Sequence, residues 1–210
     1  MNAIAPTKKA VFDDEILQDP YPTYSRLLEE GPLHYVDVGS KWPVWSVFGH
    51  AECSAMAKDS RCSAKRGPQL LLTLPLSRQK EFSDLARMFS LWMIFMDPPE
   101  HTRLRKLLNK GFSPAAIEAL RPQVESLVDR MLKPLRPGME IDLLSEFAYP
   151  MPVSVISEMM GVPEALHGKF GDWSRAIALF RGSPNRTVEY AAAAQDAMVH
   201  LTEYFRETVA

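Results

Sequence analysis

The fold is decided by one stretch of the sequence, Met96-Asp-Pro-Pro-Glu-His-Thr-Arg-Leu-Arg-Lys-Leu-Leu-Asn-Lys-Gly-Phe-Ser-Pro114. It predicts a helix over residues 98–110, because Asp97 is a good N-cap and Pro98 suits the first helical position. Glu100 lies three residues after Asp97, as in a capping box. The start of this helix is therefore well specified by its own residues.

The predicted helix carries cationic side chains on two opposite faces. At about 100° per residue, His101 and Arg105 share one face with Leu108, and Leu104 lies beside them. A charge on this leucine-bearing face is costly to bury unless an anion meets it, so the pair calls for an acidic partner. That partner is either a protein carboxylate or the carboxylate or phosphate of a ligand. The opposite face can stay in water and carries Arg103, Lys106 and Lys110.

The rest of the chain is predicted to be mainly helical, with a small sheet near the amino terminus. Aromatic and β-branched residues at 33–48, divided by Gly39-Ser40-Lys41, predict a hairpin. No repeat or low-complexity linker interrupts the chain, which favours one continuous body over two domains. Apolar periodicity and breaking residues predict helices at 19–31, 50–58, 98–110, 115–135, 145–160, 164–180 and 187–210, and a short strand at 139–143.

The stretch from 60 to 95 has poor periodicity and contains the breakers Gly67, Pro68 and Pro75. Two interpretations are open. It is either a long binding loop or lid, or a helical segment whose boundaries the pattern hides. Its large apolar residues form either a ligand-facing wall or ordinary core. These residues are Leu70, Leu71, Leu72, Leu74, Phe89, Trp92, Met93, Ile94 and Phe95.

Composition excludes several classes of protein. A formal net charge of -2 over 210 residues gives no reason to expect a nucleic-acid partner. Two cysteines, Cys53 and Cys62, are too few for a disulfide framework and match no metal spacing, so a reducing cytoplasm is expected. No apolar run suits a signal peptide or a membrane span, so a soluble, unanchored protein is expected.

The other histidines show no metal spacing and are predicted to be surface or packing residues: His34, His50, His167 and His200.

Three motifs in register resemble the amino-terminal half of a bacterial cytochrome P-450. DPPEHTRLRKLLNKGFSP is similar to the third major helix of that family, DPYPTYSRLLEEGPLHYV to its first helix and strand, and LLSEFAYPMPVSVISEMMGVP to its fifth helix. The resemblance covers nearly the whole chain. It implies a mainly α fold, a P-450-like helical body with a small antiparallel β-sheet, cut before the central helix and the haem-cysteine loop.

The resemblance also implies a role for each part of a single domain. His101 and Arg105 correspond to the contacts with the two haem propionates. The opposite face of Arg103, Lys106 and Lys110 corresponds to the docking face for a ferredoxin or flavin-type electron donor. The loop at 61–96 corresponds to the variable substrate loop, with Leu71, Leu72, Phe89, Trp92 and Ile94 as its apolar side chains. The implied parts are 19–60, 61–96, 97–136 with the propionate-contact helix, 139–162, and the substrate-lid helices 163–210.

The family's catalytic equipment has no counterpart in these 210 residues. Neither Cys53 nor Cys62 lies in a setting that presents a thiolate to iron, and the last helix stops at Ala210 without a capping residue. The resemblance therefore implies a haem-thiolate monooxygenase that inserts one oxygen atom from O2 into a small hydrophobic organic substrate, represented by a fragment that is inactive alone. A non-catalytic P-450-like helical binding module is the alternative. A hydrolase with acid-base carboxylates is disfavoured, because no Gly-x-Ser-x-Gly elbow is present.

Overall fold

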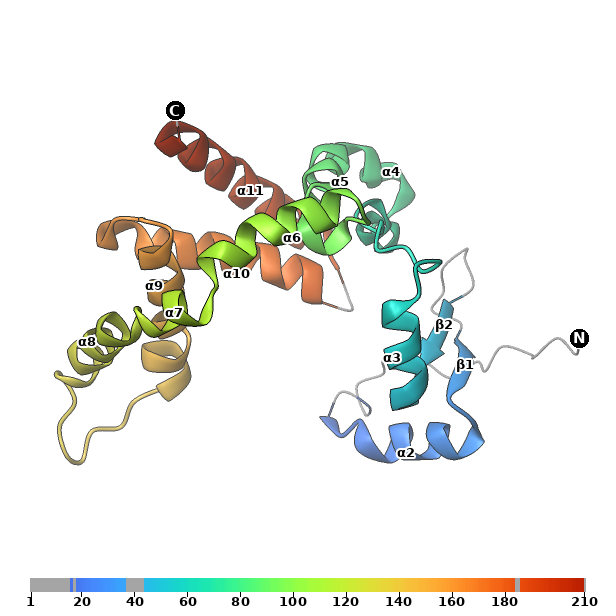
Figure 1. Cartoon of the computed structure of the whole chain (residues 1–210), viewed down its shortest axis with the longest axis horizontal. Coiled ribbons are helices and arrows are strands. Elements are labelled where there is room, and N and C mark those ends of the chain that lie inside the picture. Colours follow the sequence, from blue (N-terminus) through green and yellow to red (C-terminus); the bar gives the residue numbers. More distant parts are fainter. Residues whose placement is uncertain (1–15, 17, 37–43, 184–185, 210) are drawn as a thin grey trace, which may run out of the picture. The chain divides into compact units, whose positions relative to one another are not determined.

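The computed structural model describes residues 16, 18–36, 44–183 and 186–209, and its chain divides into two compact units. The first unit is Met1–Arg66 and the second is Gly67–Ala210. Each unit is internally packed and is described by itself (Figure 1). The prediction that the chain is part of a single domain is not tested by this division.

The first unit is a helix, a hairpin and a second helix. The two strands pair antiparallel, with His34 opposite Ser46. The first helix ends at Gly31, whose φ of 138° is a backbone conformation that favours glycine. These elements confirm the predicted short helices and hairpin strands, whereas Gly39-Ser40-Lys41 and the first residues of the second expected strand lie outside the described residues. The elements are α2 (Tyr21–Glu30), β1 (Leu33–Val36), β2 (Val44–Val47) and α3 (His50–Lys58).

The second unit is helical throughout its described part. Short 3-10 turns and short α-helices alternate in its first third, and longer α-helices follow. The elements are η1 (Pro68–Thr73), α4 (Leu76–Gln79), η2 (Lys80–Phe82), α5 (Ser83–Ser90), η3 (Met93–Phe95), α6 (Glu100–Gly111), α7 (Pro114–Glu118), α8 (Arg121–Leu132), the π-helical turn η4 (Leu144–Ala148), α9 (Pro150–Met159), η5 (Glu164–Leu166), α10 (His167–Gly182) and α11 (Val188–Val209).

Prolines and capping residues divide several helices that the sequence predicts as continuous. The helix expected at 115–135 is two helices, α7 and α8, and a proline lies in the first turn of each. Proline has no N–H to donate and is tolerated only in that first turn, so the chain starts a new helix there. The helix expected at 145–160 is divided in the same way into η4 and α9, whose first residue is Pro150.

The strand predicted at 139–143 is wrong. None of these five residues, all of which the structure describes, is in a strand. Strand backbone needs a neighbouring strand for its hydrogen bonds, and the sheet of the described residues consists of β1 and β2 alone. The Asp142 carboxylate instead accepts from the backbone N–H groups of Leu144 at 2.9 Å and Ser145 at 3.2 Å, which starts the turn η4.

The stretch from 60 to 95 is a set of short helices from residue 68 onward, not an irregular loop. Of its two open interpretations, the helical one is correct. Its apolar side chains pack into the main core, because Leu85 and Phe89 are fully buried and Phe89 stacks on Phe180 of α10 at 5.9 Å between ring centroids. The helical periodicity could not be detected in the sequence, because each of these helices is only three to eight residues long.

Helices α10 and α11 complete this core. They are the most extensively packed pair of elements, and they lie side by side as a helical hairpin (Figure 1). Small residues allow the close approach, since Ala191, Ala194 and Ala197 of α11 are buried. Among the described residues, no helix is long and apolar enough to cross a membrane.

Candidate functional site

Helix α6 positions the predicted His101 and Arg105 pair. The helix begins at Glu100, and its N-cap is Pro99 without a side-chain capping bond, so the predicted capping role of the Asp97 carboxylate is not observed. Asp97 contributes through its backbone, because its carbonyl accepts from the His101 N–H at 3.1 Å. The helix therefore begins two residues later than predicted, and it keeps both of its basic faces.

His101 and Arg105 lie one turn apart on α6, and His101 is half-buried while Arg105 is exposed. Within the described part of the chain, no hydrogen bond or ion pair joins either side chain to another residue. The protein carboxylate that the sequence offered as a partner is therefore not among the described residues. The physical reason is that α6 has no buried residue, so its cations keep their water and need no internal counter-charge.

Apolar surface lies next to these two basic residues. Leu108 is 49% exposed and Phe112 54%, while Leu104 is half-buried. Leucines of a helix that packs on a core are normally covered, and a group of exposed ones marks a binding surface. The face of α6 that bears His101 thus combines two hydrogen-bond donors with an uncovered apolar surface.

The opposite side of α6 is a solvent-exposed basic face, as predicted. Its three residues are all exposed, and no ion pair joins them to a described acidic residue. Exposed cations without an ion-pair partner attract anionic partners at long range, and they stay hydrated, so no desolvation free energy is lost. They are Arg103, Lys106 and Lys110.

The five residues predicted for the substrate loop differ in burial. Phe89 is fully buried and Leu71 is 7% exposed, and both belong to the core. Leu72 and Ile94 are exposed, at 47% and 52%. Trp92 is half-buried and packs edge-on against Phe89 at 4.9 Å between centroids. Helical turns explain this division, because they direct neighbouring side chains to opposite sides.

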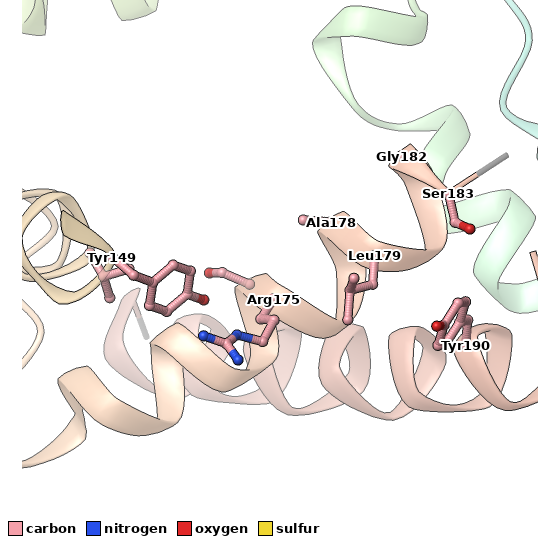
Figure 2. A pocket seen from close by; sticks show the side chains of 9 residues that line it. Tyr149, Arg175, Ala178, Leu179, Gly182, Ser183 and Tyr190 are labelled. Carbon is pink, nitrogen blue, oxygen red and sulfur yellow. The ribbon is translucent and has the colours of Figure 1, made fainter. Parts of the chain in front are cut away.

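A groove that the sequence did not predict runs between α9, α10 and α11. It comprises two adjoining hollows of about 540 and 430 Å³, which share Tyr149, Val153 and Ser174. Figure 2 shows Arg175 and Tyr149 directed toward each other at one end. The Arg175 guanidinium lies 4.4 Å from the centre of the Tyr149 ring, and the Tyr149 hydroxyl donates to the Gly171 carbonyl at 2.8 Å. The four-residue spacing of small residues along α10 was the available signal.

Comparison with known proteins places this arrangement in a family. No protein-family model matches the chain. The cytochrome P-450 monooxygenase PikC of Streptomyces venezuelae is 35% identical over 193 residues, which are 91% of this chain and 42% of PikC. The 6-deoxyerythronolide B hydroxylase of Saccharopolyspora erythraea is 33% identical over 188 residues, 88% of this chain and 46% of that protein. The crystal structure of P-450 BioI with a hexadec-9Z-enoic acid-ligated acyl carrier protein matches with a TM-score of 0.81 and 27% identity, over 93% of this chain and 49% of that one. The chain belongs to the cytochromes P-450.

This cytochrome P-450 chain spans about half the length of the curated relatives it matches. The match confirms the resemblance to the amino-terminal half of the family, and it confirms the mainly α fold with a small antiparallel sheet. The order of elements along the chain therefore follows the P-450 order that the three motifs indicated.

Cytochromes P-450 carry haem, and helix α6 fits one edge of that group. A haem is a flat apolar ring with two carboxylates on one edge, and this face of α6 offers two hydrogen-bond donors without partners among the described residues, beside exposed apolar side chains. Neither cysteine of this chain shows a comparable fit to the axial position of the haem iron. The Cys53 thiol is half-buried and donates to the Val47 carbonyl at 3.4 Å, and Cys62 is exposed in a turn.

The remaining histidines behave as packing or surface residues, as predicted. His34 and His167 are buried, and the Nε2 atom of each lies within 2.9 Å of backbone carbonyl oxygens. His50 is exposed, and His200 stacks on Trp173 at the surface. In the part of the chain that the structure describes, no three His, Cys, Asp or Glu side chains come together as a metal site.

Proposed function

We propose that this chain supplies the haem-propionate contact and the substrate-lid helices of a haem-thiolate monooxygenase, which inserts one oxygen atom from O2 into a small hydrophobic organic substrate. The observation that carries the proposal is the pair His101 and Arg105, one turn apart on α6, without partners among the described residues and beside exposed leucines. Relatives named as a monooxygenase and a hydroxylase support the reaction class. They do not favour the alternative of a non-catalytic module.

In this proposal, His101 and Arg105 donate hydrogen bonds to the two propionates. Charge-assisted bonds of this kind are about twice as strong as neutral ones, and the guanidinium fork also orients the carboxylate that it holds. Leu104 and Leu108 lie on the same face and cover the adjacent edge of the ring from water. When bound, the haem supplies the chemistry that activates O2, and a cysteine thiolate ligates its iron. We assign that ligand to neither Cys53 nor Cys62.

The substrate side of the proposal rests on residues 61–96 and on the hairpin of α10 and α11. Leu72, Trp92 and Ile94 are the members of the predicted set with surface available to a ligand. Leu71 and Phe89 support them from within the core. An apolar organic substrate suits side chains that offer surface area and no charge.

The electron-donor side of the proposal is the exposed basic face of Arg103, Lys106 and Lys110. A ferredoxin or a flavin-type donor with an acidic surface is the expected partner. Contacts between exposed charges are screened by salt, so donor binding is expected to weaken as ionic strength rises. The triple substitution of these residues to glutamine should remove most of that salt dependence.

Haem titration of the purified chain tests the propionate contact. We expect stoichiometric uptake, measured by absorbance, and a weaker affinity in His101→Ala and in Arg105→Ala. Each charge-assisted bond contributes about 1.5 to 3 kcal/mol, so each substitution should raise the dissociation constant about 10- to 100-fold. Arg103→Ala is the matched control, because it removes a cation from the opposite face of the same helix.

Equal affinities in all four proteins would refute the propionate assignment. So would an Arg103→Ala variant as weak as Arg105→Ala, because this result would mean that only net charge matters. Reduction and addition of carbon monoxide supply a second readout. We expect no thiolate-type Soret band from this chain, and such a band would show that Cys53 or Cys62 does ligate the iron.

A further inference from the structure

We infer that His200 is a pH-responsive contact between α10 and α11, which holds this helical hairpin together more tightly when its imidazole is protonated. The observation that carries the inference is the stack of His200 on Trp173 beside the Asp196 carboxylate. The inference goes beyond the proposed function and does not depend on haem, because it concerns a contact between two helices of the second unit.

The contact joins the two helices through aromatic rings. The imidazole of His200, on α11, stacks on the indole of Trp173, on α10, with 5.5 Å between the ring centroids and 8° between the ring planes. One turn along the hairpin, Phe170 of α10 meets Tyr204 of α11 at 4.9 Å between centroids. Among the ring contacts that the structure describes between α10 and α11, the His200 stack is the one whose charge changes near neutral pH.

The nitrogen of His200 that takes up the second proton is Nε2. The Nδ1 atom lies 2.9 Å from the Asp196 carbonyl oxygen, which can only accept a hydrogen bond, so Nδ1 carries the hydrogen in the neutral ring. The Asp196 carboxylate oxygen Oδ2 lies 3.3 Å from the same Nδ1. Protonation of Nε2 therefore leaves this hydrogen bond in place and adds a positive charge to a ring that already contacts a carboxylate and an indole.

The charged groups around His200 favour its cation. On α11, Asp196 and Glu203 lie about one turn to either side of it, and on α10 Lys169 lies one turn before Trp173. Two carboxylates thus oppose one ammonium group. Two further acidic residues lie farther away, on the outer side of α10 and two turns along α11: Asp172 and Glu207.

The other elements packed on α11 leave this balance unchanged. Elements α5 and η2 pack on α11, and among the described residues no ion pair joins their charged side chains to His200. Two of these side chains are already paired, one within α5 and one with Arg78 of α4. The charged residues of α5 and η2 are Lys80, Glu81, Asp84 and Arg87.

Protonation of His200 should therefore stabilise the hairpin. A cation on an indole is attracted by the negative face of the ring, and the contact with Asp196 becomes an ion pair. The unfolded chain has neither contact. The hairpin should therefore be more stable below the range in which histidines titrate, about pH 5 to 8, and should lose this contribution as the pH rises through that range.

Urea unfolding of the 210-residue chain, followed by far-ultraviolet circular dichroism, tests the inference. The measured quantity is the unfolding equilibrium constant of His200→Gln divided by that of wild type, which cancels the titration of the other histidines. We expect this ratio to be about three- to tenfold larger at about pH 5.5 than at about pH 8, because two half-exposed contacts gain a charge. In a Trp173→Leu background the ratio should depend less on pH.

The matched control is His50→Gln, which removes an exposed imidazole from the first unit. Its ratio should differ by less than about twofold between the two pH values. A His200→Gln ratio that is the same at both pH values, or larger at the higher one, would overturn the inference. A pH dependence of equal size in His50→Gln would also overturn it, because the effect would then come from net charge alone.

Nuclear magnetic resonance of the wild-type chain gives a local readout that needs no variant to fold. The indole N–H signal of Trp173 should shift with pH at the same midpoint as the ring C–H signals of His200. A Trp173 signal that does not follow the His200 titration would contradict the contact. Neither measurement involves haem, so a failed haem titration would leave both results intact.

Discussion

Buried His34 shows how a single side chain holds part of the first unit together. A carbonyl oxygen can only accept a hydrogen bond, so the Nε2 atom of His34 must carry the hydrogen that lies between the carbonyls of Leu27, at 2.8 Å, and Gly31, at 2.7 Å. The His34 ring also packs edge-on against Phe48 at 5.6 Å between centroids. This side chain of β1 thus contacts both the end of α2 and Phe48, the residue that follows β2.

Removal of this side chain should destabilise the first unit. We expect His34→Ala to lower the free energy of unfolding by about 1 to 3 kcal/mol, because two carbonyls lose their buried donor. Urea denaturation followed by tryptophan emission measures the change. His50→Ala, at an exposed position, should stay within about 0.5 kcal/mol of wild type. Equal losses in the two variants would show that the bond to α2 contributes nothing specific.

Arg186 closes the carboxyl end of α10. Its guanidinium donates to the carbonyls of Phe180, at 2.8 Å, and Arg181, at 2.9 Å, and burial lowers the pKa of this guanidinium from its ordinary value. Arginine still stays charged at neutral pH. We expect Arg186→Ala to cost about 1 to 2 kcal/mol in thermal unfolding, because two helix-end carbonyls lose their donor. Arg206→Ala, near the end of α11, is the control, and an equal loss there would contradict the capping role.

Among the helices and strands, η4 shows how a capping residue overrides a β-like pattern. Hydrogen bonds from the Ser145 backbone, and then from the Ser145 hydroxyl and the Leu144 backbone, hold the pKa of Asp142 below its ordinary value. A carboxyl whose folded pKa is lowered stabilises the fold above its unfolded pKa, and this stabilisation is lost as pH falls through the folded pKa. We therefore expect the Asp142 carboxylate to stop stabilising the start of η4 when it is protonated in acid.

Circular dichroism of two variants measures this failure. Wild type should be more helical than Asp142→Ala at neutral pH, and the difference should vanish as pH falls below the ordinary pKa of aspartate. Asp142→Asn keeps an acceptor without a titrating charge, so its helicity should show less of this pH dependence. A difference between wild type and Asp142→Ala that persists unchanged into acid would contradict the capping role.

Substitutions in helix α5 and just after it test whether Phe89, one of the predicted substrate residues, belongs to the core. Phe89 contacts the rings of Trp92, Phe95 and Phe180 and is fully buried. We expect Phe89→Ala to cost about 3 to 5 kcal/mol in chemical denaturation, the usual loss for a large aromatic in a core. Leu91→Ala, 63% exposed on the same segment, should change stability by less than about 0.5 kcal/mol. A small loss at Phe89 would instead indicate an open, ligand-facing position.

For the chain as a whole, we expect haem uptake without catalysis. The thiolate ligand pushes electron density onto the iron and favours O–O cleavage, and neither Cys53 nor Cys62 is assigned to that position. Incubation of the 210-residue chain with haem, a ferredoxin, its reductase and a hydrophobic substrate should give no oxygenated product by mass spectrometry. Full-length PikC with the same donor is the positive control. Product from this chain above that of free haem would refute the expectation.

The sequence by itself determined the two hairpin strands and most of the longer helices, but not the short helices between residues 68 and 95. The hairpin strands and the short helices near the amino terminus follow from prolines, glycines and β-branched residues, all of which act within a few positions of the chain. Three such local patterns in register were also enough to identify the family. The basic faces of α6 followed in the same way from helical periodicity.

Only the tertiary structure decided which of these surfaces are covered. It placed Leu71 and Phe89 in the core while it left Leu72 and Ile94 exposed, and it left His101 and Arg105 without a described protein partner. It also formed the groove beside Ala178 from side chains of three successive helices. The burial of a side chain depends on contacts between different elements of the fold, and local sequence patterns do not specify those contacts.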